Sequence, residues 1–177
     1  MKHLLKKEIL KLKNKLNINQ TTINKFQSFV DSEKKLTKSE GNQIHICTFF
    51  LPINKKTKSI YLINHIKAQM WIPPGGHIEK EEHPIRTVIR EFEEELDHQL
   101  ITEKVRLFNL SITAIDRPWQ NCVTHYDFWY SVEVEKIQFN FLKKEFYQGD
   151  WFDFESGIKK ITRKSYQNII KNLIKVL

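Results

Sequence analysis

Hydrophobic residues recur three and four positions apart in two stretches near the N-terminus. The first stretch covers residues 3–16, and its apolar positions are Leu5, Ile9, Leu12 and Leu16. The second covers residues 20–35, and its apolar positions are Ile23, Phe26, Phe29 and Val30. Because this spacing gathers side chains on one face of a helix, each stretch predicts an amphipathic helix that packs its apolar face on the rest of the protein.

The lysine-rich face of the first helix is compatible with more than one role. A basic amphipathic helix can lie on a membrane surface or contact nucleic acid. A helix that packs its apolar stripe on the protein also leaves its lysines in water, and we favour this interpretation. We predict that residues 1–40 form a helical extension and residues 41–177 the main domain, with a polar turn at residues 38–42 between them.

From Ile44 the pattern changes to short runs of β-branched and aromatic residues, which are typical of strands. The predicted strands cover residues 44–51, 59–64, 71–72, 104–115, 122–134 and 148–155. The polar residues 54–58 predict a hairpin turn. A final helix is predicted over residues 157–175, with Ile158, Ile161, Ile169 and Leu173 on its buried face. This order of elements predicts the α/β class, with a mixed β-sheet between helices.

One predicted helix combines an apolar face with a group of acidic residues. It begins at Pro84, which suits a first helical turn. Its apolar positions are Ile85, Val88, Ile89, Phe92 and Leu96. Glu91, Glu94 and Glu95 share the neighbouring face, which we expect to lie beside the core and not within it. Such carboxylates repel one another by a few tenths of a kcal/mol per pair, and a hard divalent cation would reverse that effect.

A solvated acidic face alone would also explain these glutamates, but the surrounding spacing favours metal-assisted chemistry on phosphates. Five residues separate Gly76 from Glu82, and seven separate Glu82 from Arg90-Glu91-Phe92-Glu93-Glu94-Glu95. This arrangement resembles the signature box of Nudix hydrolases. The preceding Trp71-Ile72-Pro73-Pro74-Gly75-Gly76 is similar to the strand and turn that lead into that box. The resemblance covers about residues 44 to 175 and implies a Nudix-type α/β/α sandwich.

One position departs from the family pattern. The box of Nudix proteins ends in Gly followed by an apolar residue, and this chain has Asp97 and His98 there. The departure concerns the end of the helix more than the chemistry. We predict that Asp97 adopts the left-handed conformation that the family's Gly would adopt, because Asp tolerates it better than most residues.

The resemblance implies hydrolysis of a nucleoside diphosphate linked to another group, by attack of water on phosphorus, with Mg²⁺ or Mn²⁺ as cofactor. The positions that hold the metal in the family correspond to Glu91, Glu94 and Glu95. Gly75 offers a backbone carbonyl as a further ligand. Arg90 would orient a carboxylate, and Glu82 is its expected partner or a supporting ligand. The identity of the general base varies within the family and stays open among these glutamates.

Four further residues are candidates for substrate binding: Gly76, His125, Asp127 and Trp151. The Gly75-Gly76 backbone is able to approach a ligand closely, although it also suits an ordinary tight turn. His125 and Asp127 share one face of a predicted strand, where they could bind a cation, orient a base or simply satisfy each other. Trp151 is a candidate for the pocket that holds the nucleotide base, or for the core.

Two alternatives to an active hydrolase of small nucleotides remain. A catalytically inactive nucleotide-binding or regulatory Nudix module would share the fold and the metal site. An RNA 5′-end pyrophosphohydrolase would use the same site, with the basic N-terminal helix on the RNA chain. The net charge of +8 favours polyanionic partners in general. We expect a nucleotide-type small molecule in preference to RNA, and a homodimer is compatible with the sequence.

The remaining composition narrows the setting of the protein. A chain of 177 residues with 40% hydrophobic residues is long enough for one buried core. Cys47 and Cys122 form no C-x-x-C pair, which indicates reduced core thiols and makes zinc binding an unlikely expectation. Neither a secretory signal nor an apolar run of the roughly 20 residues needed to span a membrane is visible. We therefore expect a cytoplasmic protein.

Overall fold

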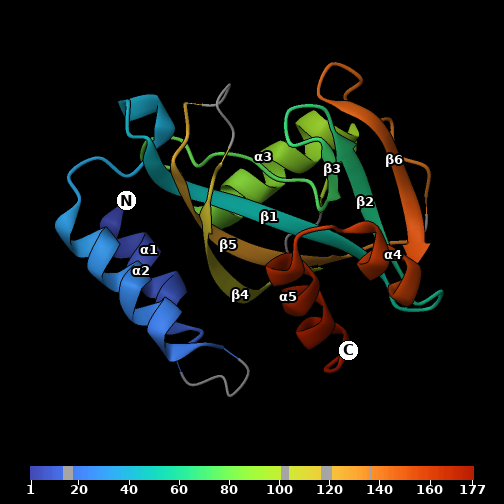
Figure 1. Cartoon of the computed structure of the whole chain (residues 1–177), viewed down its shortest axis with the longest axis horizontal. Helices are drawn as coiled ribbons and strands as arrows, with labels where there is room; N and C mark the ends of the chain where they lie inside the picture. The colour runs from blue at the N-terminus through green and yellow to red at the C-terminus, as the bar shows by residue number, and fades with distance from the viewer. Residues whose placement is uncertain (14–17, 101–103, 117–120, 136) are drawn as a thin grey trace. The chain divides into compact units, whose positions relative to one another are not determined.

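The computed structural model describes residues 1–13, 18–100, 104–116, 121–135 and 137–177 (Figure 1). The helices are α1 (Lys2–Leu10), α2 (Gln20–Ser32), the 3₁₀ helix η1 (Lys38–Glu40), α3 (Pro84–Leu96), α4 (Phe154–Lys160) and α5 (Lys164–Ile174). The strands are β1 (Ile44–Asn54), β2 (Ser59–His65), β3 (Met70–Ile72), β4 (Val105–Ala114), β5 (Thr124–Glu133) and β6 (Phe146–Asp153). The predicted α/β class, with a mixed sheet and N-terminal helices before it, is confirmed.

The described strands follow the order β3-β2-β1-β5-β4, and β6 pairs with β2. The chain divides into two compact units, each built from three segments. The first unit contains Met1–Phe49, Gly75–Val88 and Leu107–Tyr130, and the second contains Phe50–Pro74, Ile89–Arg106 and Ser131–Leu177. The two units do not follow the predicted boundary at residue 40, and the division into an extension and a domain stays a prediction.

The N-terminal helices are part of the first unit, where α1 and α2 lie side by side (Figure 1). The apolar positions predicted for both helices are buried: Leu5, Ile9, Leu12, Ile23, Phe26, Phe29 and Val30. The ring of Phe26 meets the rings of Tyr126 and Phe128 edge-on, at centroid distances of 5.0 and 5.2 Å. Helix α2 therefore packs on β5, and the prediction of packed amphipathic helices is confirmed. The predicted position Leu16 lies outside the described residues.

A buried carboxylate attaches α1 to the same unit. Glu8 is 2% exposed and forms an ion pair with Lys11. The Nδ1 atom of His83 accepts from the backbone N–H of Ile85, so Nε2 carries the ring proton and donates to Glu8 at 3.3 Å. The Tyr130 hydroxyl donates to the other carboxylate oxygen of Glu8 at 3.4 Å. Burial is the main cause that lowers the pKa of His83, so the ring is a neutral donor near pH 7.

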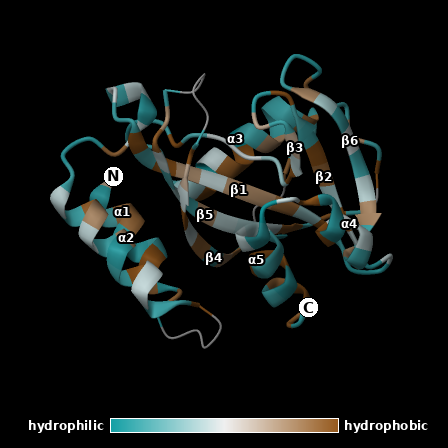
Figure 2. Cartoon of the chain, in the orientation of Figure 1, coloured by the Kyte–Doolittle hydropathy of each residue, from teal (hydrophilic) through white to brown (hydrophobic). Residues whose placement is uncertain are grey.

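The second unit contains the hairpin that the sequence predicts. Asn54 pairs with Ser59 across the turn, and its side chain accepts from the backbone N–H of Thr57 at 2.9 Å. Strand β2 pairs antiparallel with β3 and with β6. Its residues Ser59–Ile63 are buried in succession, and Figure 2 shows hydrophobic colouring along part of β2. None of the helices in the described ranges is long and apolar enough to cross a membrane.

The single helix predicted over residues 157–175 is wrong, because the chain forms α4 and α5 with a break between them. Ile161 is extended, with φ −75° and ψ 119°, and its side chain is fully buried. Its carbonyl accepts from the side chain of Gln167 at 2.6 Å, which replaces a helical hydrogen bond. The β-branched Ile161 and Thr162 lower the helix propensity at this point. Ile169 and Leu173 are buried as predicted, and Ile158 is half-buried.

Candidate active site

Helix α3 carries the acidic residues, and it has a buried apolar face and a left-handed residue after its last turn. Val88, Phe92 and Leu96 are buried, and the Phe92 ring lies 5.3 Å from that of Phe50. The helix ends at Leu96, and Asp97 follows with φ +50°, in the left-handed region. The predicted conformation of Asp97 is therefore confirmed. The backbone N–H of Asp97 donates to the carbonyl of Glu93 at 3.0 Å, which satisfies one of the last carbonyls of the helix.

The three glutamates of α3 (Glu91, Glu94 and Glu95, hereafter the Glu set) differ strongly in burial. The Glu94 side chain is 57% exposed and that of Glu91 is 13% exposed. Residue Glu95 is only 4% exposed. The expectation that these side chains lie beside the core is therefore wrong for Glu95, because the apolar face of α3 is wide enough to include it. The Glu set therefore offers carboxylate oxygens at different depths, from the exposed Glu94 to the buried Glu95.

Arg90 connects two members of the Glu set. Its Nη1 atom donates to Glu91 at 2.8 Å and to Glu94 at 3.3 Å. Desolvation by burial raises the pKa of the Glu91 carboxyl above its ordinary value, and Arg90 opposes that rise. A cation beside Glu91 would oppose it in the same way. The guanidinium thus contacts two of the three carboxylates of the Glu set.

Glu82, Gly75 and Gly76 belong to the first unit. Glu82 accepts from the backbone N–H of Glu79 at 3.0 Å and from the Thr87 hydroxyl at 2.8 Å, so it supports the turn before α3. Its expected partnership with Arg90 stays a prediction. Gly75 has φ +158°, and a Cβ atom there would overlap the carbonyl oxygen of Thr48. Only glycine fits this close backbone approach.

The substrate-binding candidates outside the box have structural contacts. Asp127 is buried and accepts from the hydroxyls of Ser111 and Thr113 at 2.8 and 2.7 Å. Trp151 donates from its indole N–H to the Ile137 carbonyl at 2.7 Å, and its ring lies 5.5 Å from that of Tyr61. Asp127 therefore lies in the core, and Trp151 is half-buried with structural contacts. His125 lies in β5 and is half-buried.

Comparison with known proteins relates the chain to one family. Residues 44–173 match the NUDIX domain family. The structure of dihydroneopterin triphosphate pyrophosphohydrolase from E. coli is similar, with a TM-score of 0.64 and 15% identity over 75% of this chain and 96% of that one. A NUDIX-family hydrolase from Clostridium perfringens has a TM-score of 0.59 and 20% identity, covering 76% and 98%.

The mutator MutT protein from Bacillus halodurans is also similar, with a TM-score of 0.58 and 18% identity over 73% of this chain and 81% of that one. At these identities the structural similarities show a shared fold alone. Among proteins with curated descriptions, none matches this chain.

Proposed function

Because the chain belongs to the NUDIX family, we propose that it is a metal-dependent pyrophosphohydrolase that cleaves a nucleoside diphosphate linked to another group. The observation that supports this function best is the fixed group of Arg90, Glu91 and Glu94 on α3, at the spacing of the family's box. Arg–Glu pairs also stabilise ordinary helices, so it is their position within the family's box that favours the functional interpretation. Hydrolysis by water attack on phosphorus follows from the family.

Glu91, Glu94 and Glu95 would hold Mg²⁺ or Mn²⁺, with the Gly75 carbonyl as a further ligand. Carboxylate oxygens are the donors that these hard cations prefer, and Mg²⁺ takes only one or two carboxylates directly while it keeps several waters. The graded burial of the Glu set agrees with such unequal roles. When bound, the ion would neutralise the diphosphate and lower the pKa of a coordinated water.

The residues of the chain then have separate tasks. Arg90 would hold Glu91 and Glu94 in place through its Nη1 atom, which donates to both carboxylates and limits their rotation before substrate binds. Gly75 keeps the turn close to β1, so that the Gly76 backbone is rigid where a phosphate would approach. Burial raises the pKa of Glu91, and a bound cation would oppose that rise.

The test is hydrolysis measured with Mg²⁺, with Mn²⁺ and with chelator, on the full chain. The substrates are normal and oxidised nucleoside triphosphates, nucleotide sugars, ADP-ribose, dinucleoside polyphosphates, dihydroneopterin triphosphate and RNA with a 5′ triphosphate. We expect metal-dependent cleavage of at least one of them. Glu94→Gln and Glu95→Gln should each lower turnover roughly a hundredfold or more, which corresponds to about 2.7 kcal/mol of barrier.

Glu93→Gln is the matched control, because Glu93 is exposed on the same helix and lies outside the Glu set. Since Glu95 is buried, its variant also needs a melting curve to show that it folds. A folded protein that binds nucleotide with metal but cleaves none of the substrates would identify a regulatory module. Cleavage of RNA alone, weakened steeply by salt, would identify an RNA-end hydrolase. Turnover like the wild type in both glutamine variants would refute the proposed site.

A further inference from the structure

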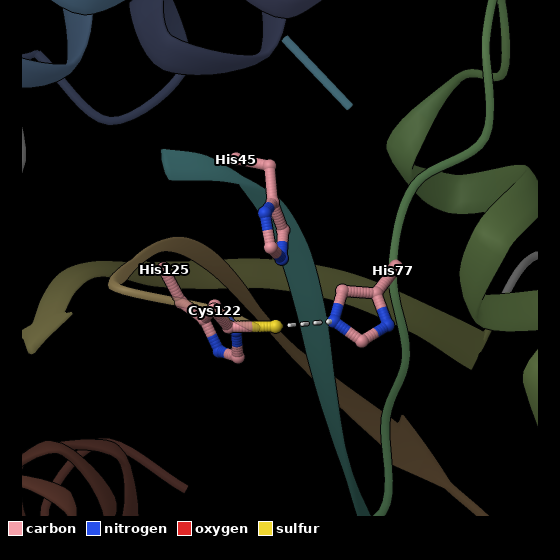
Figure 3. Close-up of side chains that lie close together, drawn as sticks. All are labelled: His45, His77, Cys122 and His125. Carbon is pink, nitrogen blue, oxygen red and sulfur yellow. Dashed lines mark hydrogen bonds between the residues drawn. The ribbon is translucent and has the colours of Figure 1, made fainter. Parts of the chain in front are cut away.

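Four side chains that lie far apart in the sequence converge within the first unit: His45, His77, Cys122 and His125 (hereafter the His–Cys cluster). One potential ligand atom from each lies within 4.8 Å of the others. Figure 3 shows the three imidazole rings around the Cys122 sulfur. We propose that this cluster is a zinc site, separate from the Glu set and independent of the proposed hydrolase function.

Backbone pairing on β1 brings these residues together. The Thr48 N–H donates to the Gly76 carbonyl at 2.9 Å, and the Ile78 N–H donates to the Ile46 carbonyl at 3.2 Å. Cys47 and His77 therefore face each other in an antiparallel bridge. At the start of β1, the Gln43 carbonyl accepts from the N–H of Val123 at 2.9 Å. The positions of His77 and Cys122 relative to His45 are thus fixed by the main chain.

His45 is arranged as a metal ligand would be. Its Nδ1 atom lies 2.7 Å from the Asn42 carbonyl, which can only accept, so Nδ1 carries the proton. The lone pair is therefore on Nε2. That atom is buried and has no hydrogen-bond partner among the residues that the structure describes, and residue His45 is 0% exposed. A ligating histidine usually donates its other N–H to a carbonyl or carboxylate, because this fixes the tautomer and the ring.

The spacing of the rings agrees with a shared central ion. The ring of His45 lies 4.9 Å from that of His77 and 4.9 Å from that of His125, and the rings of His77 and His125 are 5.4 Å apart. In a tetrahedral site with Zn–N distances of about 2.0–2.1 Å, the centres of two imidazole rings lie roughly 5 Å apart. The Cys122 sulfur lies 3.9 Å from Nε2 of His77, close to the roughly 3.6 Å expected between such ligands.

The donor chemistry selects the metal. Three imidazole nitrogens and one thiol sulfur match Zn²⁺, which is usually four-coordinate and tetrahedral in closed sites. Mg²⁺ and Mn²⁺ prefer oxygen, so they suit the Glu set and not this cluster. Cys122 is 6% exposed, while His77 and His125 are half-buried, which leaves the cluster a route to solvent for the ion. A zinc ion here would join β1, the segment after Gly76 and the start of β5.

The cysteines provide a matched pair of variants. Cys47 is as buried as Cys122 and also lies near His125, in a second grouping with Asp127.

The full chain is first freed of metal with chelator, and Zn²⁺ is then titrated against a chromophoric chelator in the presence of excess Mg²⁺. Excess Mg²⁺ keeps zinc from the carboxylates of α3. A parallel titration with Co²⁺ reads coordination directly, because a thiolate-to-cobalt charge-transfer band reports the sulfur ligand.

We expect a single tightly bound zinc ion per chain, a melting temperature raised by zinc, and a cobalt spectrum with tetrahedral ligand-field bands and a thiolate band. Cys122→Ser should abolish the thiolate band and weaken zinc binding by more than the about 10- to 100-fold that loss of an outer-shell partner costs. Cys47→Ser should keep both. His77→Gln, at a half-buried position, should weaken zinc binding while the thiolate band with Co²⁺ remains.

Three results would overturn the proposal. The first is zinc binding that excess Mg²⁺ displaces, because that ion would belong to carboxylates. The second is loss of the thiolate band in Cys47→Ser but not in Cys122→Ser, which would move the metal to the other grouping. The third is a folded wild-type protein with no tight zinc binding. If Cys122→Ser does not fold, the wild-type cobalt spectrum and the His77→Gln titration decide the question.

Discussion

The Glu set comes from residues 91–95 of one helix, whereas the His–Cys cluster comes from β1, the segment after Gly76 and the region where β5 begins. A helix repeats its faces every three and four residues, so the relative positions of the carboxylates follow from local geometry. The His–Cys cluster exists only when backbone pairing joins distant segments. A local set can therefore be altered without unfolding the protein, and a non-local one depends on the packing around it.

The largest expected effect concerns the local set. Arg90→Lys should lower turnover on the active substrate about tenfold to a hundredfold, because a flexible lysine ammonium is less well preorganised than the planar guanidinium whose Nη1 atom donates to both Glu91 and Glu94. The unfolding midpoint should change little, since the Arg90 side chain is 27% exposed. Steady-state kinetics and a denaturant melt measure the two quantities.

Arg86→Lys serves as the control, because Arg86 is exposed on the same helix. Unchanged turnover in Arg90→Lys would mean that Arg90 contributes only general positive charge, and equal losses in the two lysine variants would mean that the loss does not come from the contacts of Arg90. Either result would remove the evidence that Arg90 acts through its contacts with Glu91 and Glu94.

A second substitution tests how far the first unit depends on docking of α1. Glu8→Ala should lower the free energy of unfolding by about 1–3 kcal/mol, because it leaves the buried Tyr130 hydroxyl and the His83 N–H without their acceptor. It should also weaken zinc binding if the His–Cys cluster depends on the packing of this unit. Chemical denaturation with and without zinc measures both effects.

Glu81→Ala is its matched control. Glu81 pairs with the N-terminal amine at 2.7 Å, but its side chain is 69% exposed, so its loss should cost less than about 1 kcal/mol. If Glu8→Ala costs no more than Glu81→Ala, α1 is attached by its apolar face alone.

The smallest expected effect concerns the end of α3. Asp97→Gly should relieve about 1 kcal/mol of strain at φ +50°, partly offset by the greater entropy of glycine in the unfolded chain. Thermal denaturation measures the balance. Asn140→Ala separates out the 3.3 Å hydrogen bond from Asn140 to the Asp97 carboxylate. A clear loss of stability in Asp97→Gly, with none in Asn140→Ala, would show that the Asp97 carboxylate has another role.

The features that could be predicted from the sequence are those that depend on local patterns. The periodicity of α2 and α3, the hairpin turn at Asn54 and the left-handed Asp97 each depend on a few neighbouring residues, and all are confirmed. The break at Ile161 was missed because the apolar period continues across it. The burial of Glu95 was missed because periodicity indicates a direction around the helix and not the depth of the covering layer.

The His–Cys cluster forms no recognisable zinc motif in the sequence. Zinc motifs are recognised when two pairs of ligands each lie two to four residues apart, and within this cluster only the interval Cys122–His125 is that short. The sequence analysis argued against zinc from the number of cysteines alone. That argument does not take account of histidines from other segments of the chain. The one local signal for the cluster was therefore Cys122-Val123-Thr124-His125, which places two of its members three residues apart.

The pairing of Gly76 and Ile78 with β1 limits the insertions and deletions that this segment of the chain can accept. Side chains in a ladder alternate between two faces, so a shift of one residue would turn His77 to the opposite face. An insertion or deletion between Gly76 and Ile78 would produce such a shift, and it would also alter the interval from Gly76 to Glu82. The length of this segment is therefore constrained, and its composition is constrained as well at Gly75, where only glycine fits beside Thr48.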